Sequence, residues 1–196
     1  MVSASLVTWR SSRLRRLDRL RAAHDVYGSG PGRRWETEEL NHALVLRLAS
    51  EFQGFARDLH REALDGVVFA VGRSVPGMAA VLRIPYVNAR RLDRGNADPG
   101  ALNKDFGLFG MRIWAELESR YPGRCASWNR KLSALNTARN GIAHDDREKL
   151  AMAEADGWPM TLRSVDRWRS ALNGLARGMD HVVGEYLGGI IGAPPW

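Results

Sequence analysis

The residues best suited to chemistry lie close together in the second half of the chain, in the run Arg139-Asn140-Gly141-Ile142-Ala143-His144. The apolar pattern before this run advances by four, three, four and three residues, the spacing of one helix face, through Trp128, Leu132, Leu135, Arg139 and Ile142. The pattern therefore predicts an arginine on an apolar stripe. Because a guanidinium keeps its charge and is costly to bury unpaired, Arg139 is expected to face an anion, a partner subunit or a wet cleft.

Arginine, amide and imidazole together suit the handling of a phosphodiester. In metal-free RNA cleavage the ribose 2′-OH attacks phosphorus and the 5′-oxygen leaves, so protons must move and phosphoryl charge must be stabilised. Histidine is the usual proton carrier near neutral pH, and the arginine fork matches phosphate geometry. We therefore interpret Arg139 and His144 as candidate catalytic residues, with Asn140 orienting one of the two partners. The alternative is a structural pair of cations at a helix C-terminus, where the helix dipole favours positive charge.

Positions five apart do not share a face of an ideal helix, so Arg139 and His144 would need help to converge. Gly141 lies between them and is expected to let the helix loosen there. Asp145 and Asp146 follow directly and are interpreted as surface charges that could pair with either cation.

The net charge of +7 is unevenly spread along the 196 residues. Residues 1–34 hold eight arginines and two aspartates, a balance of +6, so the basic character belongs to an N-terminal arm. Such an arm can attract phosphate backbones without sequence preference, and the candidate contacts are Arg13, Arg15, Arg16 and Arg19. A solvated helix face is the competing interpretation. An apolar content of 44% is enough for one domain with a real core.

Other features narrow the class of protein. Cys125 is the only cysteine, so no intramolecular disulfide is possible and nothing argues for secretion. One cysteine and five scattered histidines offer no zinc-type spacing, and we expect no metal and no cofactor. No stretch is long enough to span a bilayer, and the N-terminal order of apolar and basic residues is the reverse of a secretory signal. The sequence therefore predicts a cytoplasmic protein without a membrane partner.

Apolar periodicity predicts an all-α protein. A basic amphipathic helix is expected over residues 6–27, followed by a glycine-rich hinge at residues 28–32. Core helices are expected at about residues 36–71, 103–121, 125–144 and 161–191, with Thr37 and Thr161 as N-caps, and they would form an antiparallel four-helix bundle. Residues 73–104 are expected to form a long loop between the first two core helices, with a short helical turn near residues 78–82. Residues 145–158 are expected to be a charged turn region, with a turn at residues 157–159. The expected divisions are thus a basic helical arm with its hinge (1–34) and a helical domain (35–192).

The run from Leu135 to Asp145, with its Arg-Asn-x-x-Ala-His order, resembles the signature of the HEPN superfamily of helical nuclease and toxin domains. It is similar in particular to the RiboL-PSP-like branch of that superfamily. Residues 45–60 resemble the first core helix, with a glutamate followed by aromatics, residues 95–110 the connector and second helix, and residues 161–187 the closing helix. The likeness covers residues 36–190 and leaves the basic arm outside it.

The resemblance implies a HEPN-like bundle and a metal-independent endoribonuclease, a toxin or anti-phage defence effector, whose arginine and histidine meet across a homodimer interface. On this sequence Arg139 would bind and polarise the phosphate of an RNA substrate, His144 would transfer protons, and Asn140 would orient the histidine or the phosphate. Glu51 would steady the arginine, or else form a structural hydrogen bond near the helix interface. A separate antitoxin or regulatory protein would be a possible partner.

The alternative function is a non-catalytic module that binds nucleic acid or a protein, because some domains of this superfamily serve as scaffolds. In that case the basic arm would grip nucleic acid, and the tryptophans at positions 114, 128, 158 and 168 could stack on bases. We expect these tryptophans instead to fill the bundle core or a dimer seam.

Overall fold

The computed structural model describes residues 1–27, 34–75 and 77–196, and all regular structure in these ranges is helical, which confirms the all-α class. The hinge expected at residues 28–32 lies outside the described residues. The elements, in chain order, are α1 (Ala4–Thr8), η1 (Trp9–Arg13, a π-helical turn), α2 (Leu14–Tyr27), α3 (Arg34–Ser74), α4 (Met78–Ala89), η2 (Arg91–Asp93), α5 (Pro99–Gly107), α6 (Ile113–Arg120), α7 (Cys125–Ala143), α8 (Arg147–Ala155) and α9 (Leu162–Ile191).

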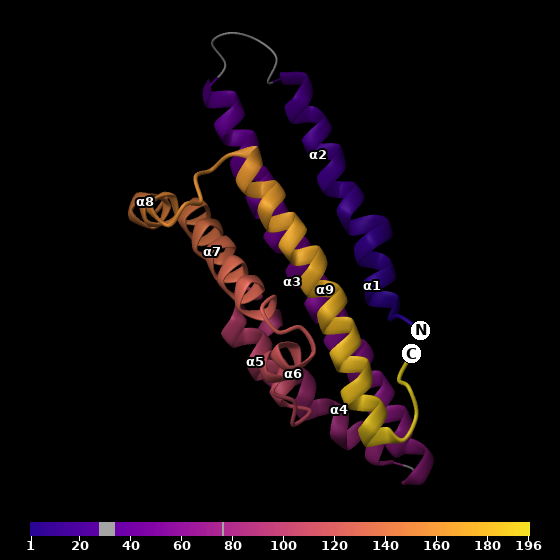
Figure 1. Ribbon diagram of the computed structural model, residues 1–196. Helices are drawn as coiled ribbons and strands as arrows, with labels where there is room; N and C mark the ends of the chain where they lie inside the picture. The colour runs from indigo at the N-terminus through magenta and orange to yellow at the C-terminus, as the bar shows by residue number, and fades with distance from the viewer. Residues whose placement is uncertain (28–33, 76) are drawn as a thin grey trace.

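The longest helices pack into one bundle. In Figure 1, α3 and α9 run side by side through its centre, α1 and α2 lie along one flank, and α7 lies along the other. The chain runs up through α1 and α2, down α3, up α7 and down α9, and its two ends lie near each other. The core is one continuous cluster, to which α3 contributes Phe52, Phe55 and Leu59 and α9 contributes Leu175 and Met179.

The N-terminal segment is part of this bundle. Trp9 and Leu17 are buried in the common core, and the Trp9 indole N–H donates to the Asn173 side chain of α9 at 3.0 Å. The backbone N–H of Ser3 donates to Asp180 at 3.0 Å. Deleting this segment would therefore expose a large apolar surface of α3 and α9, because the segment covers them on one side.

The helix expected at residues 103–121 is two helices in the structure, and the expectation of one continuous helix was wrong. The break follows Gly107, and Gly110 adopts a left-handed conformation (φ 77°) that a helix interior does not allow. A Cβ at Gly110 would lie 3.2 Å from the hydroxyl oxygen of Tyr186, whose hydroxyl donates to the carbonyl of Phe109 at 3.3 Å. The short turn lets α9 approach closely at this point.

Two segments expected as irregular are helical. α4 lies inside the expected long loop, begins where a short helical turn was expected, and contains Pro85. None of its side chains is fully buried, but Ala79 and Tyr86 pack against the core. α8 occupies much of the expected charged turn region, where the side chain of Asp146 caps it by accepting the Lys149 N–H at 3.1 Å. The helix start expected at Thr37 was also misplaced, since α3 begins at Arg34, whereas Thr161 does cap α9, accepting from Ser164 N at 3.4 Å.

Candidate functional site

The candidate run lies at the C-terminal end of α7. The buried face of this helix passes through Leu132, Leu135, Ala138 and Gly141, while Arg139 is half-buried at the edge of that face. The expectation that Arg139 stands on the apolar stripe itself was therefore wrong by one position. With 3.6 residues per turn, one full turn after Leu135 falls between positions 138 and 139. Ala138, the smaller of the two residues, is the buried one.

The end of α7 is built by a tight backbone motif. His144 is the C-cap, and Asp145 follows in the left-handed region with φ 50°. The N–H of Asp146 donates to the carbonyl of Gly141 at 2.8 Å and the N–H of Asp145 to the carbonyl of Ile142 at 3.4 Å, the pair of bonds of a Schellman motif. The backbone around His144 is therefore held in place, and α8 begins only two residues after Asp145.

Gly141 has a packing role rather than the loosening role expected from the sequence. The helix continues through Ala143 without a break at this glycine. A Cβ at Gly141 would lie 2.8 Å from Cδ2 of Leu150, so the glycine lets α8 lie directly on α7. Arg139 and His144 consequently remain about 140° apart around the helix axis, given about 100° per residue.

Asn140 connects Arg139 to the segment before α5. Its side-chain oxygen accepts from Nη1 of Arg139 at 3.1 Å and from Nδ2 of Asn96 at 2.7 Å. One turn earlier on α7, Nδ2 of Asn136 donates to the carbonyl of Ala97 at 3.2 Å and to that of Leu132 at 2.9 Å. Two asparagines thus fasten the connector to α7, and Asn140 also contacts Arg139; that Asn140 orients a catalytic group stays a prediction.

Asn96 and Asn136 belong to the site, although sequence reasoning gave neither a role. The signal for Asn136 was its position four residues before Asn140 on the same helix. Asn96 lies 44 residues away from its partner, so no local pattern could have connected the two.

The cation and the imidazole are both open to a ligand. Within the described residues, Arg139 forms no ion pair with a carboxylate, and its one side-chain hydrogen bond goes to a neutral amide. The His144 side chain is exposed and forms no hydrogen bond within the same residues. Asp146 is engaged with α8 and Lys149, so the following acids do not neutralise the pair. An anion could therefore contact either group without displacing a charged partner.

Glu51 is used elsewhere in the structure. It is only 3% exposed and lies among three arginines, Arg13 at 2.8 Å, Arg47 at 2.7 Å and Arg16 at 3.3 Å. It forms no bond with Arg139 within the described residues. Arg13 also contacts Asp58 at 2.6 Å, and its guanidinium fills the space beside Gly54, where any Cβ would clash at 2.3 Å. The structure thus places Glu51 in an ion-pair cluster that holds the N-terminal segment to α3.

The four arginines expected to contact nucleic acid fall into two groups. Arg13 and Arg16 form ion pairs with Glu51, whereas Arg15 and Arg19 are exposed and form no ion pair within the described residues.

The four tryptophans lie in the protein interior, as expected. Three of them, Trp128, Trp158 and Trp168, are buried in the core, and half-buried Trp114 donates its indole N–H to the carbonyl of Pro99 at 2.9 Å. Stacking on bases would require these rings to leave their present contacts.

A polar groove of about 560 Å³ runs between α7 and the segment that joins α8 to α9. Its three cations are Arg130, Lys131 and Arg167, which form no ion pair within the described residues, and the acid in its lining is Asp156. The Arg167 guanidinium lies 4.1 Å from the centre of the Trp158 ring and donates to the carbonyl of Gly157 at 3.1 Å. Hydroxyl groups add to the lining through Ser127, Ser133 and Thr137.

The groove and the candidate run share one line of α7. Arg130, Thr137 and His144 are seven residues apart, which is two helical turns and about 10.5 Å per step. Arg130 and Thr137 of the groove therefore lie on the same side of α7 as the exposed imidazole of His144.

Metal-binding and membrane features were sought in the same ranges. Residues 1–27, 34–75 and 77–196 contain no group of three or more histidine, cysteine, aspartate or glutamate side chains placed to hold a metal ion. No helix described there has a stretch both long and apolar enough to cross a bilayer.

The comparisons with known proteins found no relative. No family model matches the chain, and neither the curated proteins nor the solved structures include a significant match.

Proposed function

We propose that the protein is an endoribonuclease whose site is formed by Arg139, Asn140 and His144. The observation that carries the proposal is the arrangement at the end of α7. An arginine without a carboxylate partner is oriented by Asn140, and an exposed imidazole stands on a rigid helix end five residues later. The resemblance of this run to the HEPN signature supports the same assignment and, with it, a HEPN-like arrangement of the bundle.

The proposed chemistry uses these groups in distinct roles. Arg139 binds the non-bridging phosphoryl oxygens and stabilises the charge that develops on them during attack by the 2′-OH. His144 carries a proton, either from the 2′-OH or to the leaving 5′-oxygen. Asn140 is a positioning residue, because Asn96 holds its oxygen toward Arg139.

A homodimer is proposed as the active form. Within one chain the arginine and histidine diverge by about 140° around α7, and the unbroken helix at Gly141 offers no way to close that angle. A second copy placed against the end of α7 would bring another arginine and another histidine to the same cleft. Such a composite site also supplies one imidazole to accept a proton and one to donate it.

The groove along α7 is proposed to hold the RNA strand. Its three cations lack carboxylate partners, its hydroxyls can bond phosphate oxygens, and it is aligned with His144. The same groove favours the second candidate function, a module that binds RNA without cutting it. A toxin or anti-phage role, with a separate antitoxin, would be the biological setting of the first function.

The decisive experiment compares cleavage of a fluorescent single-stranded RNA by the wild type, Arg139→Ala and His144→Ala, all in a chelator. Arg73→Ala is the matched control, since Arg73 is exposed and unpaired within the described residues but lies in the last turn of α3. We expect each site variant to lose cleavage by about 100-fold or more and the control to retain it. Equal cleavage by all four proteins would mean that the nuclease activity is a contaminant and would remove the proposal.

Binding separates the two candidate functions. If no protein cleaves but all bind the RNA with a steep dependence on salt, the non-catalytic module is the correct function. Sedimentation of the wild type at several concentrations tests the dimer, and a monomer that cleaves RNA would refute the composite site.

A further inference from the structure

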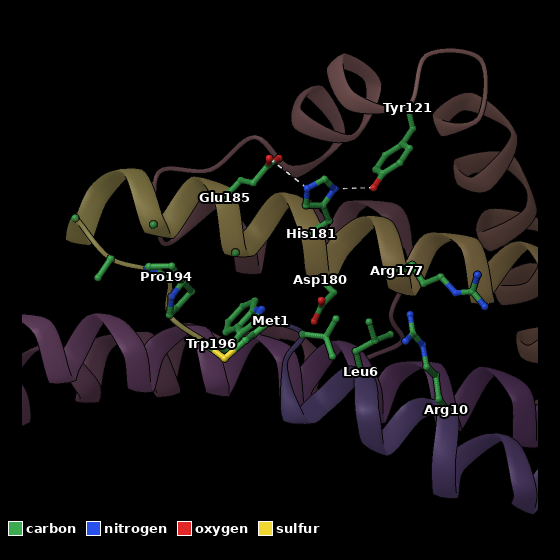
Figure 2. Close-up of a pocket in the computed structure, with 16 residues that line it drawn as sticks. Met1, Leu6, Arg10, Tyr121, Arg177, Asp180, His181, Glu185, Pro194 and Trp196 are labelled. Atoms are coloured by element: carbon green, nitrogen blue, oxygen red, sulfur yellow. Dashed lines mark hydrogen bonds and ion pairs between the residues drawn. The ribbon is translucent and has the colours of Figure 1, made fainter.

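A second cavity lies at the other side of the bundle, where the two ends of the chain meet (Figure 2). It has a volume of about 570 Å³, within the range of small-molecule sites, and none of its lining residues belongs to α7 or α8. Its walls come from the N-terminal segment, the end of α6, the last turns of α9 and the C-terminal tail 193–196. The cavity is therefore separate from the proposed nuclease site.

The cavity is open because one face of α9 carries glycines there. Gly184 and Gly188 stand where side chains would otherwise fill the space. Gly192, with φ 74°, ends α9 and lets the tail turn back over this face. The Trp196 indole packs against Gly184, where a Cβ would lie 3.3 Å from its Nε1 atom. With Leu6 on the opposite side, the tail gives the cavity two apolar walls.

Two arginines line the same cavity. Arg10 of η1 and Arg177 of α9 lie at the same end of the cavity in Figure 2; both are exposed, and neither forms a hydrogen bond or ion pair within the described residues. The nearby acid Asp180 is only 3% exposed and already accepts the backbone N–H of Ser3 at 3.0 Å. Burial raises the pKa of Asp180 above its usual value. Both guanidiniums are exposed, so an anion can reach them from solvent, and two neighbouring cations attract an anion more strongly than one.

The other acid of the cavity is also occupied. Glu185 contacts Nε2 of His181 at 3.2 Å, and the Tyr121 hydroxyl is 2.8 Å from Nδ1 of the same ring. Nε2–H donating to the carboxylate leaves Nδ1 to accept from the phenol, so the three side chains form one ordered chain along the rim (Figure 2). Their hydrogen bonds are directed at each other, so neither Glu185 nor His181 pairs with Arg10 or Arg177 within the described residues.

We infer that this cavity binds a small amphiphilic anion, with its carboxylate or phosphate group between Arg10 and Arg177 and its apolar chain or ring between Leu6 and Trp196. The guanidinium fork matches either head group. The apolar walls would shelter the chain from water, which supplies most of the affinity. The site is independent of RNA cleavage and stands or falls separately from it.

Calorimetric titration with four ligands that share an eight-carbon chain tests the inference: octanoate, octyl phosphate, octanol and octylammonium. The variants are Arg10→Gln/Arg177→Gln, which removes both charges, and Gly184→Val, which fills the cavity beside Trp196. Arg15→Gln/Arg19→Gln is the matched control, because it removes two exposed, unpaired arginines of the N-terminal segment that do not line the cavity. Circular dichroism verifies that each variant is folded.

We expect at least one of the two anions to bind at least tenfold more tightly than octanol and octylammonium. The arginine double variant should lose at least about tenfold in affinity, or about 1.4 kcal/mol, Gly184→Val should abolish binding, and the control should match the wild type. A preference between the anions assigns the natural head group to a carboxylate or a phosphate. Absence of binding by both anions, equal binding of octanol, or an unchanged affinity in the arginine variant would overturn the inference.

Discussion

His60 should make the protein lose stability in mild acid. Its ring is fully buried in α3, where Nε2 donates to the backbone carbonyl of Asp105 at 3.1 Å. Nδ1 is buried without a hydrogen-bond partner, and the ring packs on Phe106 and Phe109 at centroid distances of 5.6 and 4.8 Å. Burial among these groups lowers the pKa of His60 from 6.5 to about 4, against the opposing attraction of Asp105. The folded protein therefore holds this imidazole neutral.

The magnitude follows from the two pKa values. The unfolded chain takes up a proton near pH 6.5, whereas the folded chain does so only near pH 4. The contribution of His60 to stability is therefore intact above pH 6.5 and is lost progressively as the pH falls from 6.5 to 4. Linkage gives a loss of about 2 kcal/mol between pH 7 and pH 5, and about 3 kcal/mol by pH 4.

Urea unfolding of the wild type, His60→Leu and His60→Gln at pH 7 and pH 5 measures this loss. Both variants are expected to be less stable than the wild type at pH 7, since they disturb a packed site, but the wild type should lose about 2 kcal/mol more than either between the two pH values. Other titrating groups, including Asp180, are present in all three proteins and cancel in the difference. If the variants lose as much free energy of unfolding as the wild type over this interval, His60 is not held neutral and the reasoning is wrong.

Three further substitutions test the ion-pair cluster around Glu51 and the end of α7. Glu51→Ala should lower the free energy of unfolding by about 2 kcal/mol, because it leaves the partly buried Arg13 with only one of its two carboxylate partners, Asp58. Urea unfolding in which Glu51→Ala matches the wild type would mean that the cluster contributes nothing. Asp145→Gly should raise stability by about 0.5–1 kcal/mol, since glycine adopts the left-handed conformation without strain, and a fall in the urea midpoint would contradict this. Gly141→Val should lower stability by about 1–3 kcal/mol through overpacking against Leu150. Thermal unfolding followed by near-ultraviolet dichroism measures this loss, and a spectrum and midpoint equal to those of the wild type would contradict it.

The long helices were predictable because their sequences agree at several levels. α7 was expected at residues 125–144 and spans Cys125–Ala143, and α9 was expected to begin after Thr161, which caps it. In each case an apolar period and a boundary signal coincide. Residues 103–121 carry an apolar period too, and the break between Gly107 and Gly110 was missed although both glycines stand in the sequence. The close approach of Tyr186 to Gly110, 76 residues away, could not be read from the local pattern.

Only those residues of the candidate site that lie close together in the sequence were predictable. Arg139, Asn140 and His144 were identified because they are adjacent in sequence, and the structure links the first two directly. Asn96 could not be found in this way, since it reaches Asn140 only through the fold. The catalytic role of Glu51 stays a prediction, and the ion pairs of this carboxylate with the N-terminal segment argue for a structural one.

The distribution of ion pairs also changes which surface is expected to meet RNA. By sequence, the charge of +6 on residues 1–34 marks the N-terminal arm as the basic surface. In the structure, Arg13 and Arg16 are held by Glu51, so counting arginines overstates what that segment offers to a phosphate. Arg130 and Lys131 belong to the nearly neutral remainder of the chain, yet neither forms an ion pair within the described residues. A phosphate is attracted by charge that has no nearer counter-ion, and both the groove beside α7 and Arg15 with Arg19 offer such charge. The groove is the one that is aligned with His144, so it is the surface we propose for the strand that His144 would cut.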